Sequence, residues 1–252
     1  MPDPLMVTVA VSTLGAGAGR LCLPEPRAGI EYLILVQRPD EAPSGLWSER
    51  QDVVRVDLAD LGLSNSRNAG LTRATGDLLL FSDEDVTLDP DGILALRECF
   101  AQDPDLVLAA GWRAERLPNP PPLPAPLSRR NSGRICAPEF MVRMTALRSL
   151  GVRFDPDFGL GAVHGLGEDY VFVTDVLRAG GKGQMVPVVP GAHPHASTGD
   201  TWDDPALLAA RRAVIRRVFG GWAPVVRLAY GLRHRHRLGG LMPMLRFMWS
   251  GR

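Results

Sequence analysis

Three consecutive acids follow an apolar run in the first third of the sequence. Residues 78–81 lead through Ser82 to Asp83, Glu84 and Asp85. Adjacent carboxylates repel one another, and a site that collects them usually supplies a cation. Hard oxygen ligands favour magnesium or manganese, and a diphosphate can fill the remaining coordination positions. The pattern therefore predicts a divalent cation site for a phosphorylated ligand, with a solvated acidic turn as the alternative.

A second pair of acids, Glu168 and Asp169, stands at the start of a predicted helix. Gly167 and a glycine-rich segment, residues 153–166, precede them, and glycine lets backbone approach a ligand closely. A carboxylate within hydrogen-bond reach of a hydroxyl group can take its proton as the oxygen attacks. The structural alternative is that both acids stabilise the positive end of the helix.

The elements that must position these acids alternate between strands and helices. Short apolar runs rich in β-branched residues predict strands at 6–12, 31–37, 53–56 and 78–81. A helix beginning near Ser64 or Ser66 and ending at Gly76, and a second one after the turn at 89–92, separate later strands. This alternation predicts an α/β fold with a mostly parallel sheet flanked by helices, which binds ligands at the carboxyl ends of its strands.

A proline-rich connector, residues 117–127, divides the predicted domain, because its prolines remove backbone donors. We expect one domain over residues 1–204, with one half at about 1–110 and the other at about 111–204; the family resemblance described below implies that they are the donor half and the acceptor half of a catalytic domain. Residues 205–252 are predicted to form a helical basic tail, with helices near 205–219 and 222–236 and a short apolar and basic end.

The formal net charge of zero hides a basic tail, because no acidic residue follows Asp204. The arginines beyond it are Arg211, Arg212, Arg216, Arg217, Arg227, Arg233, Arg235, Arg237, Arg246 and Arg252. Apolar residues alternate with them, namely Val218, Phe219, Trp222, Val225, Val226, Leu228 and Tyr230. This pattern predicts association with an anionic membrane surface, with a basic helix docked on the acidic body as the alternative. Nucleic acid is not an expected partner, since no recognised binding motif accompanies the charge.

Composition indicates a globular protein of the cytoplasm. Hydrophobic residues make up 45% of the 252, enough for a substantial core. The three cysteines form neither a pair-rich pattern nor a zinc spacing. The sequence has no signal-like start and no apolar stretch near the roughly 20 residues that span a bilayer. A cytoplasmic location, with peripheral contact at the inner face of the cell membrane, is the expectation.

The segment 62–93 resembles the core of the family-2 inverting glycosyltransferases, which have the glycosyltransferase-A fold. In that family an Arg-Asn helix precedes a strand and an Asp-x-Asp motif, here Arg67, Asn68 and the acids Asp83 and Asp85. The resemblance implies that Arg67 and Asn68 lie near the donor nucleotide and Asp83 near the nucleoside. It implies that Asp85 binds the metal.

The acceptor side carries the second part of the resemblance. The stretch from Gly167 to Asp169 is similar to the family's acceptor-side motif, which implies that Asp169 is the general base and that Glu168 and Gly167 contact the acceptor. The family often has a downstream histidine that completes the metal or diphosphate site. His193 is the choice here, and His195 is the alternative.

The glycines at 15–19 permit close approach of a phosphate after the first strand. A dinucleotide motif fails there, because Arg20 occupies the position of the third glycine. Ser12 at the end of this strand, and Glu84 within the acid triplet, are assigned to donor binding. The sequence departs from family 2 after the second strand, where Gln37 and Arg38 stand and the usual acid is absent.

The implied reaction moves a sugar from a nucleoside-diphosphate sugar to an acceptor hydroxyl with inversion, assisted by manganese or magnesium. The implied acceptor is a saccharide or lipid-linked saccharide, in the synthesis of bacterial surface polysaccharide or glycoconjugate. A nucleotidylyltransferase, and a noncatalytic protein that binds sugar nucleotides or carbohydrate, are the alternatives.

Overall fold

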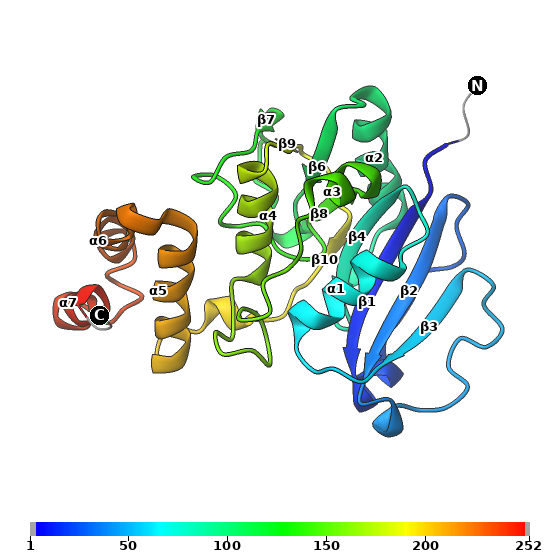
Figure 1. Ribbon diagram of the computed structural model, residues 1–252, viewed down its shortest axis with the longest axis horizontal. Coiled ribbons are helices and arrows are strands. Elements are labelled where there is room, and N and C mark those ends of the chain that lie inside the picture. Colours follow the sequence, from blue (N-terminus) through cyan, green and yellow to red (C-terminus); the bar gives the residue numbers. More distant parts are fainter. Residues whose placement is uncertain (1–3, 250–252) are drawn as a thin grey trace.

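An eight-stranded, mostly parallel sheet forms the centre of the protein, whose computed structural model describes residues 4–249 (Figure 1). The strand order is β3-β2-β1-β4-β8-β6-β9-β7. Only β8 and the short edge strand β7 run antiparallel to their neighbours. The strands are β1 Val7–Leu14, β2 Ile30–Gln37, β3 Val53–Leu58, β4 Leu78–Asp83, β6 Leu106–Ala110, β7 Ala125–Pro126, β8 Phe140–Arg143 and β9 Lys182–Met185.

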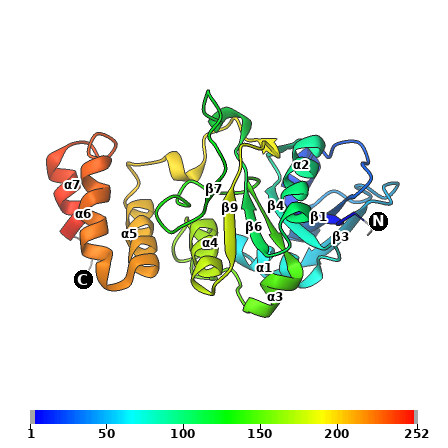
Figure 2. The same cartoon turned by 90° about the horizontal axis from the view of Figure 1, so that it is seen from above.

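Helices cover both faces of this sheet (Figure 2). Helices α1 Leu63–Arg73, α3 Met144–Leu150 and α4 Glu168–Arg178 contribute to the core on one face, and α2 Pro90–Gln102 contributes to the core on the other. A separate two-stranded ladder pairs β5 Thr87–Leu88 with β10 Gly191–Ala192. The α/β prediction, with a mostly parallel sheet between helices, is confirmed.

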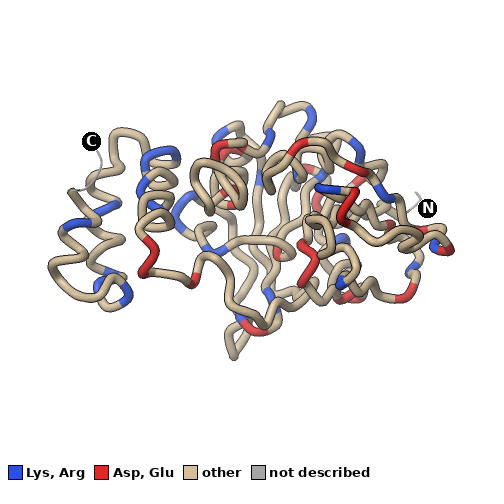
Figure 3. Tube along the Cα trace, turned by 90° about the horizontal axis from the view of Figure 1, so that it is seen from below, with Lys and Arg blue, Asp and Glu red and all other residues tan. Residues whose placement is uncertain are grey.

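Three further helices form the end of the molecule that lies beyond α4 (Figures 1 and 2). They are α5 Pro205–Phe219, α6 Ala223–Arg233 and α7 Leu241–Trp249. Figure 3 shows basic but no acidic positions along them. Within residues 4–249 no helix combines the length and the apolar character that a bilayer crossing requires.

The tail helices divide between two small apolar cores. Val214 and Val218 of α5 pack with Phe158 and with Val171 of α4. Helices α6 and α7 build their own core with Ile215 at its edge, including Met244 and Phe247. The burial of these two residues explains why the predicted apolar and basic end folds as a third helix, since helical spacing places them on one buried face.

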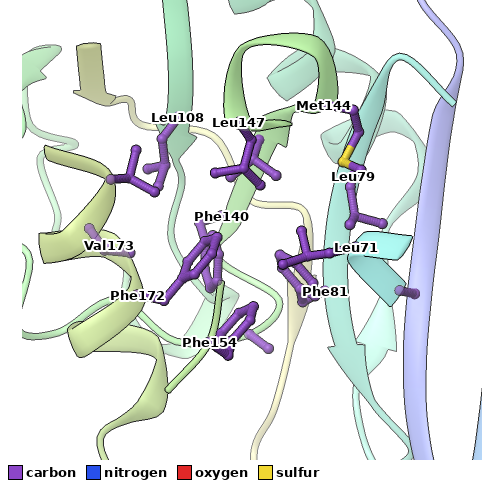
Figure 4. Close-up of a cluster of buried hydrophobic side chains, with 14 of the residues drawn as sticks. Leu71, Leu79, Phe81, Leu108, Phe140, Met144, Leu147, Phe154, Phe172 and Val173 are labelled. Carbon is purple, nitrogen blue, oxygen red and sulfur yellow. The ribbon is translucent and has the colours of Figure 1, made fainter. Parts of the chain in front are cut away.

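The core beneath the acid motifs is aromatic (Figure 4). Phe81 of β4 lies edge-on to Phe154 and Phe172, and the rings of Phe154 and Phe172 stack with centroids 4.1 Å apart. Phe140 of β8 completes the group. Because Phe81 stands two residues before Asp83, this packing fixes the end of β4 from which the acids project.

Two segments differ in detail from the sequence-based expectation. Residues Gly15–Arg20, whose glycines were expected to permit close approach of a phosphate, form a short 3-10 helix. Gly17 lies against Glu84, where a Cβ atom would come within 2.0 Å of the carboxylate. Glycine is thus required by a close contact within the protein. The proline-rich connector contributes the edge strand β7, where a proline costs no interior ladder bond.

Candidate active site

Arg67 joins the two acid motifs, although Arg67 and Asp169 are about a hundred residues apart in sequence. Arg67 belongs to α1, and its side chain, which is 2% exposed, extends to the end of β4 and the start of α4. Nη1 donates hydrogen bonds to Asp169 and, at 3.1 Å, to Glu168 Oε1. Nη2 lies 3.3 Å and 3.4 Å from the carboxylate oxygens of Asp83. One buried cation therefore holds three carboxylates.

The charges of this cluster do not balance, because one guanidinium faces three acids. Burial raises the pKa of Asp169 to about 8; Arg67 opposes this shift, while Glu168 and Asp83 add to it. The backbone N–H of Ala137 donates to Asp169 Oδ2 at 3.1 Å and favours the ionised form. Burial disfavours the charge on Arg67, yet the three carboxylates raise its pKa above the usual value. Asp169 is therefore a carboxylate of raised proton affinity.

Asp85 and His193 meet at the opposite side of the acid triplet. His193 Nε2 lies 3.1 Å from Asp85 Oδ2, and the Asp85 side chain is 53% exposed. The pairing of β5 with β10 sets this contact, since it holds Ala192 opposite Thr87, two residues after Asp85. His193 Nδ1 is buried and has no hydrogen-bond partner within residues 4–249. The ring of His195 stands 6.1 Å from that of His193, and the structure brings only His193 of the two to Asp85.

Three residues predicted to bind donor are held by contacts within the protein. Ser12 Oγ lies 2.8 Å from Ser66 Oγ, a buried contact between β1 and α1. Asn68 donates to Phe154 O and accepts from Phe154 N, both at 2.9 Å. Glu84 accepts from Thr13 Oγ1, Leu14 N and Arg20 Nη2 and so closes the 3-10 helix after β1. The structure brings neither Asn68 nor Glu84 into the Arg67 cluster, because these contacts use their polar groups elsewhere.

Gly167 fulfils a packing requirement at the start of α4. Its φ of 96° suits glycine, and a Cβ atom there would lie 2.3 Å from Val214 Cγ2 of α5. The absence of a side chain lets α5 approach the two acids that open α4. The predicted acceptor-side residue thus supports the geometry of Glu168 and Asp169, and contact with an acceptor remains a prediction.

A buried polar group beside Asp169 was missed by the sequence analysis. Glu139 is fully buried, accepts from the backbone N–H groups of Arg113 and Cys136, and its pKa is raised by burial. Arg113 is also buried, with Nε 3.6 Å from Glu139 Oε1. The available signals were an arginine just after the strand at 106–110 and an acid just before the apolar run at 140–142.

The segment after His193 connects the site to the tail. The backbone N–H of His193 donates to Glu115 Oε2 at 3.3 Å, and Ser197 Oγ lies 3.4 Å from Arg113 Nη1. Further along, Trp202 stacks on Tyr230 of the tail, with ring centroids 5.9 Å apart, and its ring lies tilted against that of His234 at 4.8 Å. This segment is therefore held at one end by the body and at the other by α6 and the turn after it.

The fold and the two acid motifs define a glycosyltransferase-A-type architecture, and comparisons with known proteins agree. Residues 48–136 match the family model described as glycosyl transferase family 2. Residues 1–349 of TarS from S. aureus, in complex with UDP-GlcNAc, superpose with a TM-score of 0.59 at 12% identity, covering 92% of this chain and 73% of that one. The match to the longer TarS structure covers 43% of that chain.

A second solved structure extends the likeness over the whole sequence. The mannosyltransferase PcManGT from Pyrobaculum calidifontis, in complex with GDP-Man and Mn2+, has a TM-score of 0.59 at 16% identity and covers 100% of this chain and 78% of that one. No curated protein sequence matches the chain. The family-2 match and the shared fold confirm the resemblance: this chain has the glycosyltransferase-A-type fold of family-2 enzymes.

Proposed function

We propose that the protein transfers a sugar from a nucleoside-diphosphate sugar to an acceptor hydroxyl with inversion at the anomeric carbon. The observation that carries this proposal is the Arg67 cluster, which sets the donor-side Asp83 and the candidate base Asp169 around one guanidinium. The family-2 match supports the reaction class. A single displacement needs one base and one means of stabilising the leaving diphosphate.

The pair Asp85 and His193 would hold a manganese or magnesium ion. A carboxylate oxygen and an imidazole nitrogen suit manganese. The Asp85 side chain, just after the end of β4, is 53% exposed, and that of His193 is 11% exposed. No group of three or more acidic, histidine or cysteine side chains in the described residues forms a cage. A metal ion whose other coordination positions are filled by substrate phosphates is usually held by only one or two protein ligands. When bound, the ion would supply positive charge to offset the leaving diphosphate.

Asp169 would accept the proton of the attacking hydroxyl. Arg67 donates a hydrogen bond to Oδ1 of Asp169, and the Ala137 N–H donates one to Oδ2. These two hydrogen bonds orient the carboxylate, and neither donor can take the proton in its place. Arg67 would also fix the position of Asp83 relative to Asp169. Burial excludes water from the carboxylate, and a raised pKa makes it a stronger base once it is ionised.

We expect Asp85→Ala to remove the manganese-dependent part of sugar-nucleotide affinity, at least about tenfold, because the diphosphate charge is then poorly compensated. His193→Ala should have the same effect. Calorimetric titration with UDP- and GDP-sugars, with and without manganese, measures it. His195→Ala is the matched control and should bind as the parent does. Equal metal-dependent affinity in parent and Asp85→Ala would remove Asp85 from the site.

The raised pKa of Asp169 predicts a pH dependence of transfer. Because the base acts when ionised, kcat/KM should rise about tenfold per unit below the pKa and level off near pH 8. The rising limb reports the free enzyme, whose Asp169 faces Arg67, Glu168 and Asp83. Rates measured across pH 5 to 9 at low donor and acceptor concentration test it. A flat profile over this range would show that another group takes the proton.

We propose a saccharide or lipid-linked saccharide as the acceptor, in the synthesis of surface polysaccharide or glycoconjugate at the inner face of a cell membrane. The side chains of Asp85 and Asp83 are 53% and 34% exposed, so the donor side of the site is open to a large acceptor, whereas Asp169 lies deeper and is 8% exposed. Product analysis with a sugar-nucleotide library tests the reaction. Release of nucleoside diphosphate supports transfer, whereas release of pyrophosphate would indicate a nucleotidylyltransferase.

A further inference from the structure

An apolar stripe on α6 is left open to solvent. Trp222, Val225, Leu228 and Leu232 follow one another at intervals of three or four residues, so they share one face of the helix. Their exposures run from 42% to 73%. Helix α7 adds three apolar residues with exposures of 63% to 75%: Leu241, Met242 and Trp249. The stripe formed by Trp222, Val225, Leu228 and Leu232 is called the tail face below.

The tail face is separate from the residues that stabilise the tail. Val218 is buried against α4, and Phe219, Val226 and Tyr230 pack into the small cores of the tail. Of the apolar residues that the sequence analysis assigned to membrane contact, only Trp222, Val225 and Leu228 are exposed. Other residues form the apolar cores of the tail, so packing within residues 4–249 does not explain why the residues of the tail face are apolar.

The arginines of the tail divide in the same way. Arg217 of α5 pairs with Asp155 and Asp175, and Arg211 is buried and donates to Gly199 O. The alternative of a basic helix docked on the acidic body therefore describes Arg211 and Arg217, whereas Arg216 of α5 is exposed and forms no ion pair within residues 4–249. Four other arginines are exposed on α6, α7 and the turn between them, and no ion pair within residues 4–249 involves them: Arg233, Arg235, Arg237 and Arg246.

We propose that the tail face docks on an anionic lipid bilayer. Its tryptophan and leucine side chains enter the interface, while the four unpaired arginines reach headgroup phosphates. Helix α6 is too short to cross a bilayer, so it would lie along the surface. The positive charge of the tail favours an anionic bilayer over a second copy of this chain, since two copies joined through the tail face would bring like charges together. A nucleic acid would neutralise the arginines and leave the apolar stripe in water.

The test compares surface variants of the full chain. Flotation with phosphatidylcholine vesicles, with and without phosphatidylglycerol, measures binding. We expect binding only to the anionic vesicles and a steep fall with added salt. Leu228→Ser with Leu232→Ser should weaken it at least tenfold. Leu123→Ser, at an exposed apolar site on the body, is the matched control and should bind as the parent does.

A second pair of variants tests the charge. Arg233→Gln with Arg235→Gln should weaken anionic-vesicle binding by about fivefold for each arginine removed. Arg129→Gln with Arg130→Gln removes two exposed arginines from the body and should leave binding unchanged. Equal binding to neutral and anionic vesicles, or equal loss in both pairs, would overturn the proposal. So would a dimer in sedimentation that Leu228→Ser with Leu232→Ser abolishes, or tighter salt-sensitive binding to duplex DNA than to vesicles.

Discussion

Asp169→Asn is expected to lower sugar transfer by about two orders of magnitude or more, the usual scale of general-base catalysis. Asparagine keeps the size of the side chain and its hydrogen bond to Arg67, but it cannot take a proton. Its amide nitrogen would face the Ala137 N–H, which Asp169 Oδ2 accepts at 3.1 Å. Some loss of stability should therefore accompany the loss of rate, and the thermal midpoint has to be measured beside kcat.

Glu168→Gln provides the matched control for this substitution. It changes the adjacent carboxylate, which Arg67 also holds, without touching the proposed base. We expect Glu168→Gln to lose less activity than Asp169→Asn, and both variants to retain manganese-dependent donor affinity. If Asp169→Asn transfers sugar at the parental rate, the acids at the start of α4 serve the helix N-terminus and the cluster, and another group is the base.

Arg67→Met is expected to destabilise the protein by about 3 to 5 kcal/mol, because it leaves buried carboxylates without their cation. Without the guanidinium, which opposes the effect of burial, the folded-state pKa of Asp169 rises further above its unfolded value. The unfolded state then binds fewer protons, so stability falls as pH rises. The defect of Arg67→Met should thus be smaller at pH 5 than at pH 8. Urea unfolding at both pH values measures it.

Arg153→Met is the control for the loss of an arginine near the same helix. Arg153 is exposed and donates to Asn68 O and Thr72 Oγ1 on α1, so its removal should cost within about 1 kcal/mol. Arg67→Lys keeps a cation with fewer donors and should recover part of the stability. A destabilisation by Arg67→Met no larger than that by Arg153→Met would show that the three acids do not depend on this cation.

Local patterns were sufficient to predict the elements that carry the site. The strand at 78–81 lies within β4, the helix expected near Ser64 or Ser66 is α1, and the helix at Glu168 is α4. Each has a hydrophobic period or a terminal residue that a short window of sequence contains. The position of the acid triplet at a strand end was therefore predictable from sequence alone.

Partnerships between distant segments could not be predicted in this way. The burial of Arg67 among three acids depends on how α1 packs beside α4, which no local window contains. His193, the histidine chosen from the sequence, lies next to Asp85 because of the register of β10 against β5, which no local window contains. Glu84 looked equivalent to its neighbours, yet it lies in the turn after β4 and its carboxylate accepts hydrogen bonds from Thr13 and Leu14 of β1.

The segment between His193 and Trp202 constrains how the chain can vary. Its first residue contacts Asp85, and its last packs against the rings of Tyr230 and His234 in the tail, so both ends are fixed. An insertion or deletion inside it would disturb the ring stack or pull the imidazole away from the carboxylate. A shortened protein that ends before α5 would likewise release Trp202 and uncover the start of α4. The tail can therefore be studied by changing its surface, but its removal would alter the donor site as well.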